Sequence, residues 1–118
     1  MKQRKRIGKK AEDLAAAYLR SQGLKILERN YQIRQGEIDI IGWDGNILVF
    51  VEVKARENLH CGYPGEALSE AKIRRICYTA EVYCFRKCVS QQTQIRFDVI
   101  EILGDRIRHI KNAFESCY

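Results

Sequence analysis

The spacing of hydrophobic and polar positions changes along the chain, and each change predicts a different element. From about residue 8 to residue 22, apolar residues recur every three or four positions, which predicts an amphipathic helix ending before Gly23. A second helical pattern follows Ser69, a good N-cap residue, and reaches about Lys87. The two apolar stripes comprise Ala11, Leu14, Ala15, Tyr18 and Leu19 in the first helix, and Ile73, Ile76, Cys77, Ala80 and Cys84 in the second.

Strands are expected in the rest of the chain. Residues 24–34 are typical of a strand or extended segment, and the β-branched, apolar stretches 37–41 and 47–54 predict a hairpin that turns at Asp44-Gly45. Further strands are expected over 94–103 and 106–110, joined by a turn at Gly104-Asp105, and residues 57–68 form a loop that contains the single proline. The order of elements predicts an α/β fold, with a mixed central sheet flanked by two helices.

Length and composition favour one packed domain. The chain has 118 residues, of which 46% are hydrophobic, enough for one core. Five cysteines with no C-x-x-C pair argue against a disulfide framework or a structural zinc site, and favour small buried thiols in a reducing compartment. The start of the chain lacks the pattern of a secretory signal, and the longest apolar run, 47–51, is too short to span a bilayer. We therefore expect a cytoplasmic protein with no membrane contact.

The net charge of +6 comes entirely from the first ten residues. The other 15 bases of the chain balance its 15 acids. Such a basic arm, expected to be flexible, either contacts nucleic acid phosphates or serves as a solvated tail that aids solubility. The six bases of this segment are Lys2, Arg4, Lys5, Arg6, Lys9 and Lys10.

The predicted hairpin carries the candidate chemistry. Side chains alternate across a strand, so Glu52 and Lys54 share a face. A turn at Asp44-Gly45 pairs Asp39 with Phe50, which brings Asp39 to the same face as a diagonal neighbour of Glu52. The same register places Glu37 directly opposite Glu52. Two carboxylates this close can share one divalent cation.

The alternative is an ordinary solvated face on which Lys54 pairs with Glu52. Val49, Val51, Ile38 and Ile40 are expected to make the other face apolar and hold the hairpin in a core. Crowded like charges destabilise a sheet, and one lysine cannot neutralise three acids, whereas a metal ion can. The added Asp39 therefore favours a metal site over the ordinary ion pair.

Residues 36–41 (GEIDII) and 49–56 (VFVEVKAR) resemble the PD-(D/E)xK nuclease superfamily. Over residues 8–114 the chain more closely resembles the YraN-like family of bacterial proteins, which is related in pattern to archaeal Holliday junction resolvases. Ile38 stands where the superfamily motif can have a proline, a departure that the YraN-like pattern tolerates. The other residues that fit this family are Gly8, Glu12, Ala15, Leu19, Arg29, Asn30, Tyr31, Lys72, Arg96, Phe97, Asp98, Val99, His109, Ile110, Asn112, Ala113 and Phe114.

The resemblance implies a restriction-endonuclease-like core and a metal-dependent catalytic site. Asp39 and Glu52 would bind Mg²⁺ or Mn²⁺, with the Val53 carbonyl as a third ligand. Lys54 would orient the attacking water or stabilise charge developing in the transition state. Glu12, on the edge of the first helical stripe, would be an additional catalytic acid that reaches the metal directly or through water. Without the resemblance, Glu12 is equally well explained as a first-turn acid favoured by the helix dipole.

Several other residues are candidates for nucleic acid contact. Lys72 lies in the first turn of the second helix, where a cation opposes the helix dipole, so pairing with a phosphate or an active-site acid would explain it as well as solvation does. Arg56 follows the motif strand and is a candidate phosphate contact. Tyr31 and Trp43 could stack on bases, although Trp43 beside a turn is equally consistent with packing. His60 and His109 have no second ligand at metal spacing and receive no catalytic role.

The main hypothesis is a metal-dependent endonuclease acting on DNA, with branched or damaged DNA as a possible substrate. The first rival is a non-catalytic nucleic-acid-binding protein of the same fold, and the second is an adaptor whose acids form only surface ion pairs. Analogy with resolvases, which cut two strands symmetrically, suggests a homodimer.

Overall fold

Two helices enclose the sheet, and both begin and end with recognisable sequence signals. The computed structural model describes residues 2–56 and 68–116, and in the first helix it describes side chains from Gly8 onward. That helix, α1, spans Lys2–Ser21, so it begins six residues before its predicted start and includes most of the basic segment. Gly23 has a φ of +93°, and the Leu24 N–H donates to the Leu19 carbonyl, which completes the predicted helix stop.

The second helix, α2, spans Glu70–Arg86, as predicted. The Ser69 hydroxyl accepts a hydrogen bond of 3.1 Å from the Lys72 N–H, and Lys87 is the C-cap residue. Ile76, Cys77 and Ala80 of the predicted stripe are buried, and Ile73 and Cys84 are half-buried against them. The prediction of buried thiols holds for Cys77, but Cys88, at the end of the helix, is exposed.

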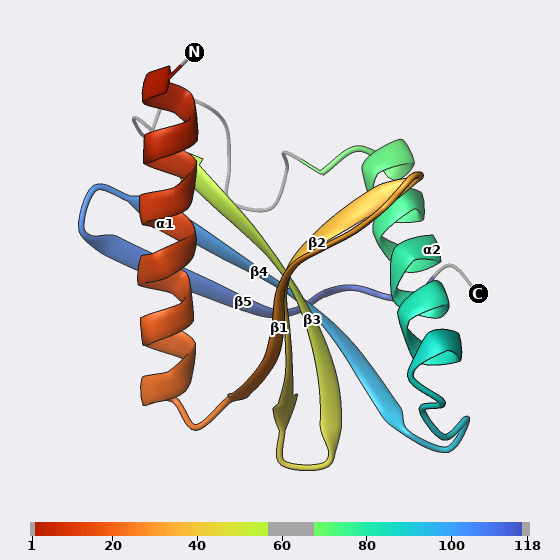
Figure 1. Ribbon diagram of the computed structural model, residues 1–118. Coiled ribbons are helices and arrows are strands. Elements are labelled where there is room, and N and C mark those ends of the chain that lie inside the picture. The colour runs from red at the N-terminus through yellow and green to blue at the C-terminus, as the bar shows by residue number, and fades with distance from the viewer. Residues whose placement is uncertain (1, 57–67, 117–118) are drawn as a thin grey trace.

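The five strands form one mixed sheet in the order β1-β2-β3-β4-β5. Neighbouring strands are antiparallel except β3 and β4, which are parallel and connected by the segment that contains α2. The helices cover opposite faces of the sheet (Figure 1). The predicted α/β fold is therefore confirmed, and this architecture is compatible with a restriction-endonuclease-like core. The strands are β1 (Lys25–Ile33), β2 (Gly36–Asp44), β3 (Ile47–Arg56), β4 (Gln94–Leu103) and β5 (Arg106–Phe114).

The β2–β3 hairpin has a different register from the predicted one. Asp44 pairs with Ile47, so the two-residue loop is Gly45-Asn46 rather than Asp44-Gly45. Gly45 has a φ of +60°, and hairpin turns of type II′ require a glycine at this first loop position. The strands shift by two residues, and Ile40 pairs with Val51. The predicted pairing of Asp39 with Phe50 is therefore wrong.

Two hydrophobic clusters hold the helices on the sheet. Ala15, Ala16 and Leu19 of α1 pack on one face, whereas Leu14 of the predicted stripe is 37% exposed. Ile38 belongs to the cluster under α2 and Ile40 to the cluster under α1, so the prediction that they share a face is wrong. The two clusters are completed by Ala11, Leu24, Ile40, Val49, Val51, Ile100 and Ile102 on the α1 side, and Ile38, Ile41, Leu48, Phe50, Ile76, Cys77, Ala80, Tyr83 and Phe97 on the α2 side.

A buried carboxylate joins β4 to β5 away from the predicted site. Asp98 has a fully buried side chain that binds the Arg96 guanidinium at 2.8 and 3.0 Å and the Asn112 N–H at 3.0 Å. His109 Nε2 lies 2.7 Å from Asp98 Oδ2. Burial alone would raise the pKa of Asp98, but the hydrogen bonds with His109, Arg96 and the Asn112 N–H hold it below its ordinary value.

In the described ranges, neither α1 nor α2 has the length and apolar character that a membrane-crossing helix requires. The predicted loop at 57–68, with His60 and Cys61, falls almost wholly outside the described residues, as does Cys117.

Candidate active site

The candidate site lies where β2 and β3 separate. Main-chain pairing between the two strands ends at Ile40 and Val51. Outside the paired region, the beginning of β2 extends toward α2, whereas the end of β3 extends toward the first turns of α1 (Figure 1). Asp39 and Glu52 are the next residues on the two strands, and they would lie opposite each other if the observed register continued. The predicted diagonal relation of Asp39 to Glu52 therefore does not fit the observed register, and Glu37 does not lie opposite Glu52 but pairs with Gln32 of β1.

The side chain of Asp39 replaces the main chain of β2 as a partner of β3. The Val53 N–H donates a hydrogen bond of 2.8 Å to Asp39 Oδ2. This bond satisfies a main-chain donor that the departing strand no longer serves, and it fixes the orientation of the carboxylate. The prediction that the Val53 carbonyl is a metal ligand remains a prediction.

Three carboxylates converge at the fork. Glu12 of α1, Glu37 and Asp39 each offer an oxygen, and these oxygens all lie within 4.8 Å of one another. The helix therefore brings Glu12 to Asp39, as expected for an additional acid. Carboxylate oxygens at this spacing are ligands that suit Mg²⁺ or Mn²⁺.

Asp39 and Glu52 resist ionisation. Burial is the main reason that the pKa of Asp39 is raised to about 7; the hydrogen bond from Val53 opposes this rise, and the charges of Glu12 and Glu37 add to it. Burial likewise raises the pKa of Glu52 to about 7, helped by the charge of Asp39. A bound cation would relieve both the burial and the repulsion of these charges.

Glu52 faces the opposite helix from Glu12. Its carboxylate lies 3.4 Å from the ammonium of Lys72, in the first turn of α2. Lys72 and Lys54 both lower the pKa of Glu52, against the larger effect of burial. Lys72, predicted to contact nucleic acid or an active-site acid, therefore pairs with an acid of the site. Among the described residues, Glu52 is not a member of the three-carboxylate group, so Asp39 connects the two sides of the site.

A cavity of about 690 Å³ opens beside the three carboxylates. Lys9 and Arg29 lie on its wall, and Arg29 also forms an ion pair of 2.7 Å with Asp13. The cavity therefore has acids that could bind a metal ion and basic groups near them. This combination suits a polyanionic ligand that would contact both the metal ion and the basic groups. The lining residues are Gly8, Lys9, Ala11, Glu12, Asp13, Arg29, Asn30, Glu37, Val53 and Ala55.

Two of the remaining predicted nucleic-acid contacts, Arg56 and Lys10, do not line this cavity. Arg56 Nε lies 2.8 Å from Glu101 Oε2, and its side chain is only 13% exposed. Lys10 is exposed on α1. Lys5 and Arg6 lie in the part of α1 whose side chains are not described. Phosphate contact by these four residues remains a prediction.

Two residues of the site had no assigned role in the sequence analysis. Glu37 was placed on the motif face, but its approach to Glu12 depends on the helix position, which the strand pattern does not reveal. Asn30 of β1 has a φ of +54° and, with its amide nitrogen toward Glu12, donates hydrogen bonds of 2.8 and 3.2 Å to that carboxylate. An asparagine inside a strand pattern was the available signal, because asparagine tolerates this backbone conformation better than most residues do.

The fold and the site together define an α/β protein with a carboxylate cluster at a fork between two strands. Residues 11–102 match the sequence profile described as uncharacterised protein family UPF0102, and the chain belongs to this family. It is similar to a UPF0102 protein of Persephonella marina, with 45% identity over 94% of this chain and 95% of the relative. It is also similar to one of Lachnoclostridium phytofermentans, with 47% identity over 93% and 98%, and to one of Clostridioides difficile, with 48% identity over 87% and 91%.

The predicted YraN-like family assignment is thus confirmed. Neither the family description nor the names of these relatives state an activity, so membership of the nuclease superfamily remains a prediction.

Proposed function

We propose that this protein is a metal-dependent endonuclease that hydrolyses DNA phosphodiester bonds, with branched or damaged DNA as its substrate. The observation that carries the proposal is the convergence of Glu12, Glu37 and Asp39 within 4.8 Å, next to Glu52 and Lys54. A fold has little to gain from crowding partly buried acids unless a cation or a reaction uses them. Two bases on the wall of the same cavity, Lys9 and Arg29, favour a phosphate-bearing substrate.

The residues of the fork have distinct proposed roles. Asp39 and Glu52 would hold Mg²⁺ or Mn²⁺, with Glu12 and Glu37 as further acids on the α1 side. When bound, such an ion polarises a phosphoryl oxygen and makes a coordinated water more acidic. The Val53 N–H keeps Asp39 in place, and Lys54 stabilises negative charge that develops on the phosphate. Lys72 holds Glu52 in position through their ion pair.

The basic segment of α1 binds the phosphates on either side of the scissile bond. The first turn of this helix contains no acid, and its bases oppose the helix dipole, which is unfavourable in the free protein. Binding of a polyanion removes that disadvantage. A homodimer would place two such sites on one DNA, as cutting of both strands requires.

Cleavage of a panel of DNA structures tests the proposal. The panel comprises single strands, blunt duplex, flapped duplex and a four-way junction, each with Mg²⁺, Mn²⁺, Ca²⁺ or EDTA. We expect cleavage with Mg²⁺ or Mn²⁺ but not with Ca²⁺, and its loss in an Asp39→Ala/Glu52→Ala variant. Asp105→Asn, which changes an exposed acid in the β4–β5 turn, is the matched control. Equal cleavage by wild type and the double variant would refute the proposal.

A further inference from the structure

A second cavity lies at the other end of the sheet from the fork. Three connections meet there: the turn before β1, the β2–β3 hairpin loop, and the loop between α2 and β4. The cavity has a volume of about 860 Å³, within the range of roughly 300–1,000 Å³ that small-ligand sites occupy. Its lining residues are Gly23, Lys25, Trp43, Gly45, Asn46, Ser90, Gln92, Thr93 and Gln94.

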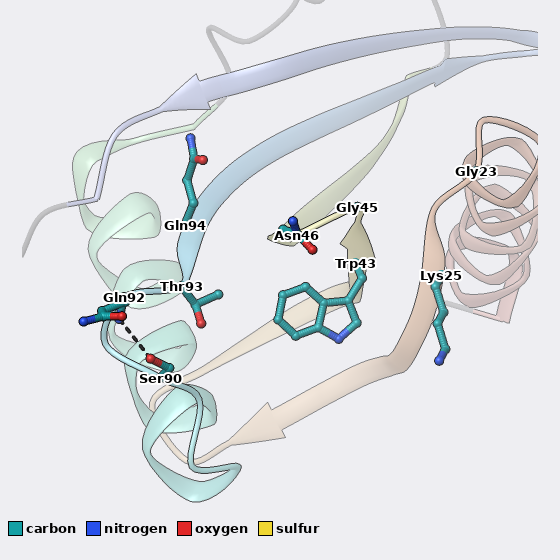
Figure 2. A pocket seen from close by; sticks show the side chains of 9 residues that line it. All are labelled: Gly23, Lys25, Trp43, Gly45, Asn46, Ser90, Gln92, Thr93 and Gln94. Carbon is teal, nitrogen blue, oxygen red and sulfur yellow. Dashed lines mark hydrogen bonds between the residues drawn. The ribbon is translucent and has the colours of Figure 1, made fainter.

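Trp43 provides an aromatic surface in this cavity. Part of its side chain packs against the hydrophobic cluster under α2, and the rest lines the cavity. Figure 2 shows the indole between Thr93, in the loop that precedes β4, and Lys25 of β1. Within the described ranges, the indole N–H forms no hydrogen bond. A tryptophan anchored by the core on one side is a firm platform on which a planar ring can stack.

The loop backbone beside the indole is held in place, while the side-chain amides around it remain available to a ligand. The Gln92 N–H donates to the Ser90 hydroxyl at 3.2 Å, and the Thr93 N–H to the Ser90 carbonyl at 3.0 Å, so the loop backbone is fixed (Figure 2). In the described part of the chain, the side-chain amides of Asn46, Gln92 and Gln94 make no hydrogen bond. Each amide offers both donors and an acceptor, the combination that reads the edge of a nucleobase.

The charge of the cavity distinguishes between possible ligands. None of its lining residues is acidic, and Lys25 supplies one positive charge. An aromatic platform, unpaired amides and a cation together match an unpaired nucleotide, with its planar base and its phosphate. A neutral sugar would use the aromatic surface and the amides, but it would gain no charge attraction from Lys25.

We propose that the Trp43 cavity binds an unpaired nucleotide of a nucleic acid. Trp43 and Asp39 lie four residues apart on β2, which is about 13 Å along a strand. One DNA molecule can therefore reach both places. The inference extends the proposed nuclease, because an unpaired nucleotide held at this distance would direct cleavage to DNA with single-stranded or distorted regions.

The fluorescence of Trp43 gives a direct test, because it is the only tryptophan in the chain. Titration of the full-length protein in EDTA with a short single-stranded oligothymidylate should quench this fluorescence, whereas a blunt duplex should leave it nearly unchanged. Trp43→Ala should weaken single-strand binding, measured by anisotropy of a labelled strand, about tenfold. Trp43→Phe should retain most of the affinity, and Tyr78→Ala, which removes an exposed aromatic ring on α2, should retain all of it.

A second variant guards against loss of folding in Trp43→Ala. Gln92→Ala leaves Trp43 and its packing intact, and it should weaken the affinity for single-stranded DNA at least severalfold. Quenching by a neutral maltooligosaccharide instead of the oligonucleotide would overturn the proposal. Single-strand binding that leaves the fluorescence unchanged and is unaffected by Gln92→Ala would also overturn it.

The same titration separates this inference from the proposed nuclease. With an Asp39→Asn/Glu52→Gln variant, quenching should persist while cleavage is lost. Metal-dependent cleavage by a wild type whose Trp43 fluorescence does not respond would refute the nucleotide cavity and leave the nuclease standing. Quenching without any cleavage by wild type would refute the nuclease and leave the cavity standing.

Discussion

Replacement of Asp39 by asparagine should stabilise the metal-free protein above neutral pH. Asp39 is partly buried beside Glu12 and Glu37, so its ionisation in the folded state is unfavourable. Asparagine has nearly the same shape and carries no charge. Its amide oxygen can still accept the hydrogen bond from the Val53 N–H that holds the fork together. The substitution therefore removes the repulsion and keeps the geometry.

The size of the gain follows from the pKa of Asp39. That pKa is about 7, against an ordinary value of 3.8. Since each pKa unit corresponds to ~1.4 kcal/mol, the ionised carboxylate costs the folded state at most about 4 kcal/mol. The Val53 N–H binds a neutral oxygen less strongly, and the repulsion between Glu12 and Glu37 remains. We therefore expect a net gain of roughly 1–2 kcal/mol at about pH 8.

The gain should depend on pH with a definite sign. Between its ordinary pKa and the raised one, Asp39 binds more protons in the folded state than in the unfolded state. Its contribution to stability is therefore fully present below about pH 4 and is lost as the pH rises through about 7. Asparagine has no such loss, so its advantage over wild type should be greatest above pH 7 and should fade toward pH 4.

Thermal melts in EDTA at several pH values test this reasoning. A gain of 1 kcal/mol corresponds to roughly 3–6 °C in Tm for a domain of this size. Added Mg²⁺ should raise the Tm of wild type and not that of Asp39→Asn, since a ligand stabilises only the state that binds it. Asp105→Asn should change neither result. A lower Tm for Asp39→Asn in EDTA at about pH 8, with no response of wild type to Mg²⁺, would refute the site.

Three further predictions concern other residues. Lys54→Met should abolish cleavage but leave DNA affinity within a few-fold, because its proposed interaction forms only in the transition state; normal turnover with poor binding would assign Lys54 to phosphate docking. Neutralising the basic segment should reduce the slope of log K against log salt by about 0.9 for each lost phosphate contact, whereas an unchanged slope would make the segment a solubility device. The substitutions are Lys5→Gln, Arg6→Gln, Lys9→Gln and Lys10→Gln, which keep α1 intact. Asp98→Asn should destabilise the fold by about 3 kcal/mol in urea titrations at neutral pH, because Arg96 loses its buried counter-charge. This difference should narrow as the pH falls below the ordinary pKa of Asp98, and a neutral effect at pH 7 would contradict it.

Most helices and strands could be predicted from the sequence because each of them carries its own local sequence signal. The helical stripe after Ser69, its N-cap hydroxyl and the glycine after α1 act within a few residues, so the sequence reveals them directly. The start of α1 was predicted too late, because a run of bases was interpreted as an arm although lysine and arginine are good helix formers. The hairpin was located correctly, but its register depended on which loop position Gly45 occupies.

The sequence predicted which residues form the candidate site, but it did not predict how they are arranged. Asp39, Glu52 and Lys54 follow from strand alternation and the motif. The separation of β2 from β3 at the residues before Ile40 does not follow from them, because this part of β2 packs toward α2. That separation brings Glu37 to Glu12 and Glu52 to Lys72, and contacts between distant elements of this kind have no local signal.

The chain order of the sheet has a consequence for synthesis. All the acids of the candidate site precede residue 53, but β3, which carries Glu52, gains its second neighbour only when β4 forms from Gln94 onward. While the chain is being made, β3 is an exposed apolar edge, and such an edge can pair with another copy. A chain that stops before Gln94 would therefore carry every proposed metal ligand and still be prone to aggregate, so assembly of a working site must wait for about the last fifth of the protein.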